Sequence, residues 1–133
     1  MSAALGKPSL HHVALGSRNV EQLARFYCSL LDTSEARRHL EDSGEVRSIW
    51  LDLGGTWLMI ERAAPEAAER SAVQGVGLGV FLLAFRGTAA ERSAFEGRAV
   101  ALGATIESRS AYTSYLRDPD GHRVAVSEYE VSP

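Results

Sequence analysis

The chain has 133 residues, of which 45% are hydrophobic and 23% are charged, and its formal net charge at neutral pH is −3. This length suits one domain that can bury a core, and the composition is typical of soluble globular proteins. The small negative charge and the scattered basic residues argue against nucleic acid or an anionic membrane as a partner, so we expect neither.

The sequence favours a cytoplasmic location. No apolar run approaches the roughly 18 to 20 residues that span a bilayer. The first ten residues lack the apolar core of a signal peptide. The single cysteine, Cys28, excludes an internal disulfide and a multi-cysteine zinc site, and its helical surroundings predict a packed thiol.

The first half of the chain predicts a βαβββ order. Residues 10–15 alternate like a half-buried strand, and residues 17–32 carry apolar side chains at helical spacing. Asn19 and Gln22 are spaced as a capping pair for that helix. Three short β-rich runs follow, separated by turns that contain glycine: residues 35–40, 45–53 and 56–61.

The same order returns after a small and polar connection. Residues 79–85 predict a strand, and residues 88–103 predict a helix that Thr88 and Glu91 open at capping-box spacing and Gly103 closes. Three further strands are predicted at residues 104–109, 112–117 and 122–129. The two helix caps lie about seventy residues apart, a spacing that indicates an internal repeat.

We therefore predict a single α+β domain over residues 1–133. Two βαβββ modules, at about residues 9–62 and 75–130 with a connection at about 63–74, form a cup-shaped mixed sheet with the helices outside.

Strand alternation assigns each side chain to one of two faces, because successive side chains point to opposite sides of a sheet. The regularly apolar set should face the helices: Val13, Leu15, Ile49, Leu51, Leu53, Leu58, Ile60, Phe81, Leu83, Phe85, Val124 and Val126. The other set should line the cup: His12, Ala14, Ser48, Trp50, Asp52, Trp57, Met59, Glu61, Val80, Leu82, Ala84, Thr113, Tyr115, Arg123, Ala125 and Ser127. Aromatic side chains with a few polar groups are typical of a small-molecule pocket.

Four motifs together resemble the vicinal-oxygen-chelate superfamily: HHVAL, ARFYCSLL, LGGTW and YLRDPDGH. Glyoxalase I, extradiol dioxygenases and the bleomycin- and fosfomycin-resistance proteins belong to it. The resemblance covers essentially the whole chain, and it is closest in motif to the fosfomycin- and bleomycin-resistance branches. It is fairly specific for the fold and weak for any one activity.

The resemblance implies a divalent metal on the floor of the cup, held from equivalent strands of both modules. His12 falls on the first ligand position, and Glu61 falls where glyoxalase I-like members carry the second. The third position is Val80 or Leu82, depending on register, and the fourth is Ala125; none of these side chains binds metal. An identical second chain supplies the same residues. We therefore expect no metal or other cofactor, with His12 and Glu61 as a partial remnant of the site.

Several histidines have alternative interpretations. His12 either forms a hydrogen bond to Glu61 or solvent, or serves as a metal ligand or general base. His11 is expected to be structural, and His39 lies in a polar, arginine-flanked strand typical of the solvated surface. His122 follows the turn at residues 118–121 and is expected to belong to that turn.

The residues that we expect to contact a ligand are Trp50, Trp57, Met59, Thr113, Tyr115, Arg123 and Ser127. Flat aromatic walls bind apolar or aromatic rings through a large contact area. Arg123 pairs with an anionic group of the ligand, or else with Glu61 or Asp52.

Three hypotheses about function follow. The leading one is a cytoplasmic homodimer that binds a small, mainly apolar or aromatic anionic molecule without an essential metal, as the resemblance to bleomycin-resistance proteins implies. The alternative is a lyase or dioxygenase-like enzyme that uses His12 and Glu61 as candidate catalytic residues, with or without a divalent metal. The third is a structural or regulatory module whose cup is filled by its own side chains.

Overall fold

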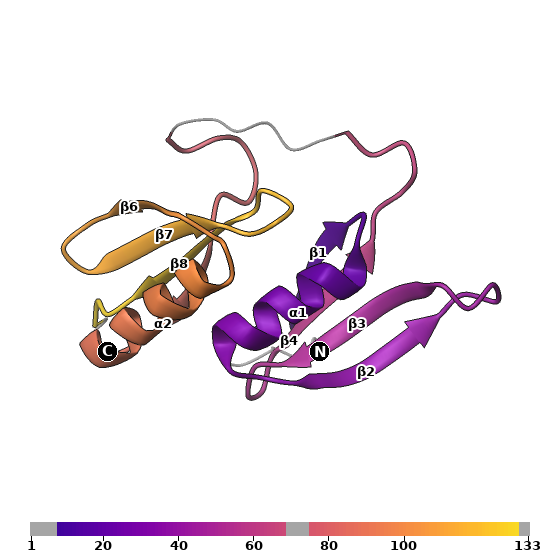
Figure 1. Cartoon of the computed structure of the whole chain (residues 1–133), viewed down its shortest axis with the longest axis horizontal. Helices are drawn as coiled ribbons and strands as arrows, with labels where there is room; N and C mark the ends of the chain where they lie inside the picture. Colours follow the sequence, from indigo (N-terminus) through magenta and orange to yellow (C-terminus); the bar gives the residue numbers. More distant parts are fainter. Residues whose placement is uncertain (1–7, 69–74, 131–133) are drawn as a thin grey trace, which may run out of the picture.

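The computed structural model describes residues 8–68 and 75–130, which form two βαβββ modules that lie side by side (Figure 1). The elements, in chain order, are β1 (His12–Ser17), α1 (Val20–Leu31), β2 (Glu35–Leu40), β3 (Val46–Asp52), β4 (Trp57–Arg62), β5 (Leu83–Arg86), α2 (Ala89–Ala101), β6 (Ile106–Arg109), β7 (Thr113–Arg117) and β8 (Arg123–Ser127). The predicted α+β fold is confirmed. Part of the predicted connection, residues 69–74, lies outside the described residues.

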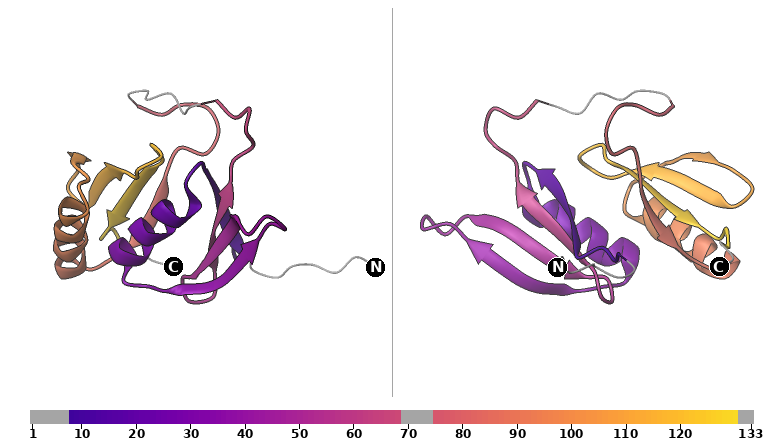
Figure 2. Two further views of the ribbon diagram at one scale, coloured as in Figure 1. Left: turned by 45° about the vertical axis from the view of Figure 1, so that its right-hand side comes forward. Right: turned by 180° about the vertical axis from the view of Figure 1, so that it is seen from behind.

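Each module has one four-stranded mixed sheet. Sheet one has the strand order β1-β4-β3-β2 and sheet two has the equivalent order β5-β8-β7-β6. The first pair in each is parallel and the other pairs are antiparallel. The helix carries the chain from the first strand of each module to the far edge of the sheet, and the next two strands return it. In the described parts of the chain no ladder joins the two sheets, which stay separate in both views of Figure 2. Within one chain the two modules therefore form two separate four-stranded sheets.

The helices begin where the capping residues predicted. The Asn19 side chain accepts a hydrogen bond from the Gln22 amide at 3.1 Å, although the reciprocal bond is absent because the Asn19 amide donates to Ser17 Oγ. At α2 the capping box of Thr88 and Glu91 is complete in both directions.

The predicted helix-facing set forms the core. Eleven of its twelve members belong to the buried core cluster or pack against it: Val13, Leu15, Ile49, Leu51, Leu53, Leu58, Ile60, Leu83, Phe85, Val124 and Val126. The exception is Phe81, whose ring lies 4.3 Å from the Arg123 guanidinium carbon. The predicted strand at residues 79–85 is wrong in its first half, since β5 begins only at Leu83. Residues outside a ladder need not alternate, which is why the assignment failed at Phe81.

A buried hydrogen-bond network joins the two modules. Tyr27 on α1 donates from its hydroxyl to Asp118 Oδ2 at 2.6 Å, across 91 positions of sequence. Ser17, at the end of β1, donates to Asp120 Oδ2 at 2.6 Å. Both carboxylates belong to the turn between β7 and β8, where Gly121 takes the φ of +85° that closes the turn. The turn at residues 118–121 therefore has a second role besides reversing the chain. Its carboxylates accept hydrogen bonds that hold the second module against the first.

Neither described helix is long and apolar enough to cross a membrane.

Candidate ligand-binding surface

The candidate site lies on the face of sheet one that points away from α1, which we call the open face. The strand register places His12 beside Trp57 and Trp57 beside Asp52 in one row. The next row holds Ala14, Met59 and Trp50, and the third holds Gly16, Glu61 and Ser48. The predicted inward residues of the first module therefore do share one face. Its aromatic members, Trp50 and Trp57, are partly exposed.

Trp50 is the centre of this face. Its ring centroid lies 6.1 Å from that of Trp57, with the ring planes tilted by 54°. Its indole nitrogen donates to Ser48 Oγ at 3.1 Å, which fixes the orientation of the ring. The two tryptophans lie on neighbouring strands of one sheet, so they extend a wall along the face.

Two residues of the open face were missed in the sequence. Arg37 pairs with Trp50 in the ladder of β2 and β3, and its guanidinium carbon lies 5.8 Å from the centroid of the Trp50 ring. His39 pairs with Ser48, and its ring lies 5.4 Å from that of Trp50. His39 is partly buried there, so its assignment to the solvated surface is wrong. Because β2 is polar at almost every position, it has no alternation that could have assigned its faces.

In sheet two the inward residues of the second module also share a face. Tyr115 pairs with Ala125, and Thr113 pairs with Ser127. The hydroxyls of Thr113 and Ser127 form a hydrogen bond of 2.9 Å. Tyr115 is partly exposed, whereas Ala125 is fully buried.

Arg123 has a different partner from those we expected. Its guanidinium donates to Glu107 Oε1 at 3.0 Å and to the Gly75 carbonyl at 3.3 Å, and the Phe81 ring lies over it. The residue is only 8% exposed. Arg117 and Arg123 donate to the same carboxylate and hold the pKa of Glu107 below its ordinary value. The expected pairing of Arg123 with Glu61 or Asp52 is therefore wrong.

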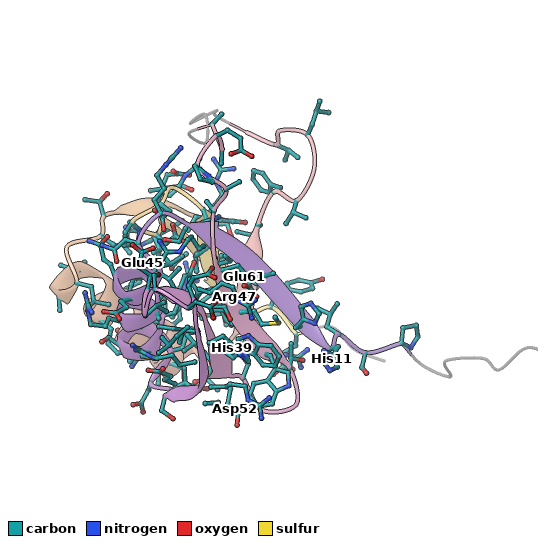
Figure 3. The ribbon with its side chains drawn as sticks, turned by 90° about the vertical axis from the view of Figure 1, so that its right-hand side faces the viewer. His11, His39, Glu45, Arg47, Asp52 and Glu61 are labelled. Carbon is teal, nitrogen blue, oxygen red and sulfur yellow. The ribbon has the colours of Figure 1, made fainter. Side chains whose placement is uncertain are left out.

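His12 and Glu61 do not lie together. The β1–β4 register sets His12 opposite Trp57 and Glu61 opposite Gly16, four residues along the strand. Four residues of strand span about 13 Å. Instead, His12 Nδ1 lies 2.9 Å from His11 Nδ1, and Figure 3 shows His11 well apart from Glu61. The expected hydrogen bond between His12 and Glu61 is absent.

The donors for a family-type metal do not converge within the chain. In residues 8–68 and 75–130 no three histidine, cysteine or acidic side chains are grouped so that they could hold a metal ion. The two modules also align at their turns, with Gly55 before β4 and Gly121 before β8. By this alignment Leu82, which directly precedes the first β5–β8 pair of Leu83 and Val124, is the sequence counterpart of His12. The described residues of one chain do not fit such a metal.

His122 belongs to the turn, as expected. Its backbone amide donates to Asp118 Oδ1 at 2.9 Å, and its Nδ1 lies 2.7 Å from Oδ2 of the same carboxylate. Cys28 is partly buried, and burial followed by the nearby Glu35 carboxylate raises the pKa of its thiol. A raised pKa favours the protonated thiol over the thiolate.

A groove of about 510 Å³ runs between β1 and the segment that leads into β5. Its walls include Leu10, Ala14, Val80, Leu82 and Ala84, and Arg123 also lines it. The groove is therefore lined by five of the predicted inward residues: Ala14, Val80, Leu82, Ala84 and Arg123. The side chain of Val80 is 83% exposed.

Comparison with known proteins agrees with the fold. In structure the chain is similar to the fosfomycin resistance protein FosX from Listeria monocytogenes, with a TM-score of 0.72, 16% identity and 92% of each chain covered. It is also similar to lactoylglutathione lyase from Agrobacterium tumefaciens, with a TM-score of 0.65 and 19% identity over 92% of this chain and 94% of that one. TioX from Micromonospora sp. ML1 gives a TM-score of 0.66 and 18% identity, over 92% of this chain and 100% of the other.

At these identities the likeness shows the fold and leaves the activity open. No curated protein matches the sequence at a significant level. The family model of the glyoxalase-like domain, however, matches residues 12–127, which is most of the chain. The protein therefore belongs to the glyoxalase-like domain family, within the vicinal-oxygen-chelate superfamily that its motifs resemble.

Proposed function

We propose that this protein binds a small organic molecule, mainly apolar or aromatic and with one acidic group, and that binding needs no metal. The observation that carries the proposal is the pair of adjacent, partly exposed tryptophans on a sheet face that no helix covers among the described residues. Partly exposed indole rings with polar neighbours favour a flat apolar guest, because stacking adds about 0.5–1.5 kcal/mol per ring pair beyond the buried area.

The absence of an essential metal is part of the same proposal. It is supported by the residues at two positions where the family carries metal ligands. These residues are Leu82 and Ala125, whose side chains have no atom that can coordinate a metal. The alternative, a lyase or dioxygenase that uses His12 and Glu61 jointly, has less support because the register holds the two side chains about 13 Å apart along the sheet.

We also propose that the protein is a cytoplasmic homodimer in which the partner covers the open faces. The chain exposes several large apolar side chains, among them Leu10, Val76, Leu78 and Val80, and two of these, Leu10 and Val80, line the groove. Burying such exposed apolar side chains lowers the free energy of the protein. In a two-fold dimer the side chains of both chains would be buried at one interface. In such a dimer each chain would cover the open face of its partner, and each open face would become the wall of an enclosed cup.

The test is ligand binding followed by tryptophan fluorescence and melting temperature. A panel of aromatic acids and their neutral analogues should contain molecules that quench the fluorescence and raise the melting temperature of the wild-type protein. Trp57→Ala should weaken binding of every such ligand by about tenfold or more, since tenfold in affinity corresponds to about 1.4 kcal/mol. Tyr112→Ala, which truncates a 50%-exposed ring of the second module, is the matched control.

A panel that leaves both observables unchanged would contradict the proposal. It would then favour the third hypothesis, in which the side chains of the protein itself occupy the cup.

A further inference from the structure

The open face contains a cation that is placed to select the charge of the ligand. Arg37 is exposed, and within the described residues no carboxylate forms an ion pair with it. Its neighbour in sequence, Arg38, is held by Glu35 at 2.6 Å and by Glu21 at 3.0 Å. Arg123 is buried and bound to Glu107. Arg37 is thus the arginine that adjoins the tryptophans and retains its hydrogen-bonding capacity.

The strand order fixes how Arg37 and the two rings are arranged. Sheet one runs β4-β3-β2, so Trp50 on β3 lies between Trp57 on β4 and Arg37 on β2. The steps from Trp50 are 6.1 Å to the Trp57 ring and 5.8 Å to the Arg37 guanidinium. Trp50 therefore has an indole ring on its β4 side and a cation on its β2 side.

Two carboxylates, those of Glu61 and Asp52, share the open face with Arg37. Glu61 lies across Ser48 from His39, two strands away, which is about 10 Å. Asp52 Oδ1 accepts the Gly54 amide at 2.7 Å and is engaged in the turn that follows β3. His39, 5.4 Å from the Trp50 ring, adds a second nitrogen donor beside Arg37.

We propose that Arg37 binds the acidic group of the ligand, and that the ligand class is a planar aromatic carboxylate whose ring lies on Trp50 and Trp57. The proposal rests on the proposed function. A guanidinium offers a planar pair of N–H donors that matches the two oxygens of a carboxylate. Contact with the Trp50 face favours the cation at this position and limits its freedom before the ligand arrives. The carboxylate must be attached to the ring directly or through one carbon, because the steps are short.

The experiment compares 2-naphthoate with 2-naphthamide, which has the same rings and no charge. Isothermal titration of the full-length chain gives both dissociation constants, and the two indole N–H signals in a nitrogen-15 NMR spectrum report contact with the tryptophans. The wild-type protein should bind the acid about five- to tenfold more tightly than the amide.

Arg37→Gln should weaken the binding of 2-naphthoate and leave the binding of 2-naphthamide unchanged, so that the two dissociation constants become similar. Arg37→Lys keeps the charge without the planar pair of donors and should retain only part of the preference. Arg25→Gln, which removes an exposed arginine of α1 on the other side of the sheet, should leave the preference unchanged.

An acid preference that survives in Arg37→Gln would overturn the inference, and so would equal affinities in the wild-type protein. In the first case the proposed function would stand in full. In the second case the aromatic ligand would still bind, but the acidic group would be removed from the proposed function. If neither compound shifts an indole signal of the wild-type protein, both the inference and the proposed function are wrong.

Discussion

The hydroxyl of Tyr27 is a single atom on which the junction between the modules depends. The side chain is fully buried, and its only polar atom donates to Asp118 Oδ2 at 2.6 Å. Tyr27→Phe removes that donor and keeps the ring, so the apolar packing of α1 stays intact. Asp118 keeps its bonds from the Asp120 and His122 amides and from the His122 ring. The change therefore isolates one hydrogen bond between the modules.

The expected loss of stability follows from the charge of the acceptor. A hydrogen bond to a charged group contributes about 1.5–3 kcal/mol, so Tyr27→Phe should lower the free energy of unfolding by about 2 kcal/mol. The entropy of unfolding is about 2.1 cal/mol/K per residue, or about 0.28 kcal/mol/K for a chain of 133 residues. The melting temperature should accordingly fall by about 7 °C.

The dependence on pH supplies a second measurement. Burial, and then the charge of Asp118, raise the pKa of Tyr27 far above the ordinary value of 10.0. A pKa raised in the folded state gives stability that is complete below the unfolded value and is lost as the pH rises beyond it. The wild-type protein should therefore lose stability above pH 10 more steeply than Tyr27→Phe.

Urea denaturation and thermal melts of both proteins, at neutral pH and between pH 9 and about 11, provide the assay. Tyr112→Phe, at a half-exposed tyrosine, is the control and should change the free energy of unfolding by less than about 0.5 kcal/mol. If Tyr27→Phe has the melting temperature of the wild-type protein and loses stability equally steeply above pH 10, the hydroxyl does not stabilise the junction, and the reasoning is wrong.

Three further predictions concern acid stability, metal content and assembly. Arg109 and Ser114 hold the pKa of Glu96 at about 2, so its stabilisation should be lost as the pH falls below 4.5, and Glu96→Gln should show a shallower loss in acid denaturation. Elemental analysis of untagged protein after dialysis without chelator should find no stoichiometric zinc, nickel, manganese or iron; one equivalent per chain, lost in His12→Ala, would favour the enzyme instead. Light scattering should give twice the chain mass of 14.4 kDa, and a monomer at micromolar concentration would contradict the dimer.

Local signals predicted most of the fold. The capping box at Thr88 and Glu91, the turn glycines and the alternation of apolar side chains depend on residues close in sequence. The capping box and the turns hold in the structure, and the alternation holds everywhere in the helix-facing set except at Phe81. The error at Phe81 arose where the chain is apolar without being paired, because a run of apolar residues looks the same inside and outside a ladder.

The candidate site could be predicted only in part. Alternation placed Trp50, Trp57 and Met59 on one face, but the position of each side chain along that face depends on the register between strands. Register separates His12 from Glu61, and it brings Arg37 from a mostly polar strand to the Trp50 ring. Neither result is encoded in the pattern of a single strand.

The sequence by itself determined the order of elements, the repeat of the βαβββ module and the faces of those strands that alternate, because these properties follow from backbone periodicity and capping. Only the tertiary structure decided which charged groups meet. Arg123 pairs with Glu107 across 16 positions, and Tyr27 reaches Asp118 across 91, so both contacts depend on how strands and modules dock. A charged side chain takes whichever opposite charge lies within about 4 Å, and that choice is made in three dimensions.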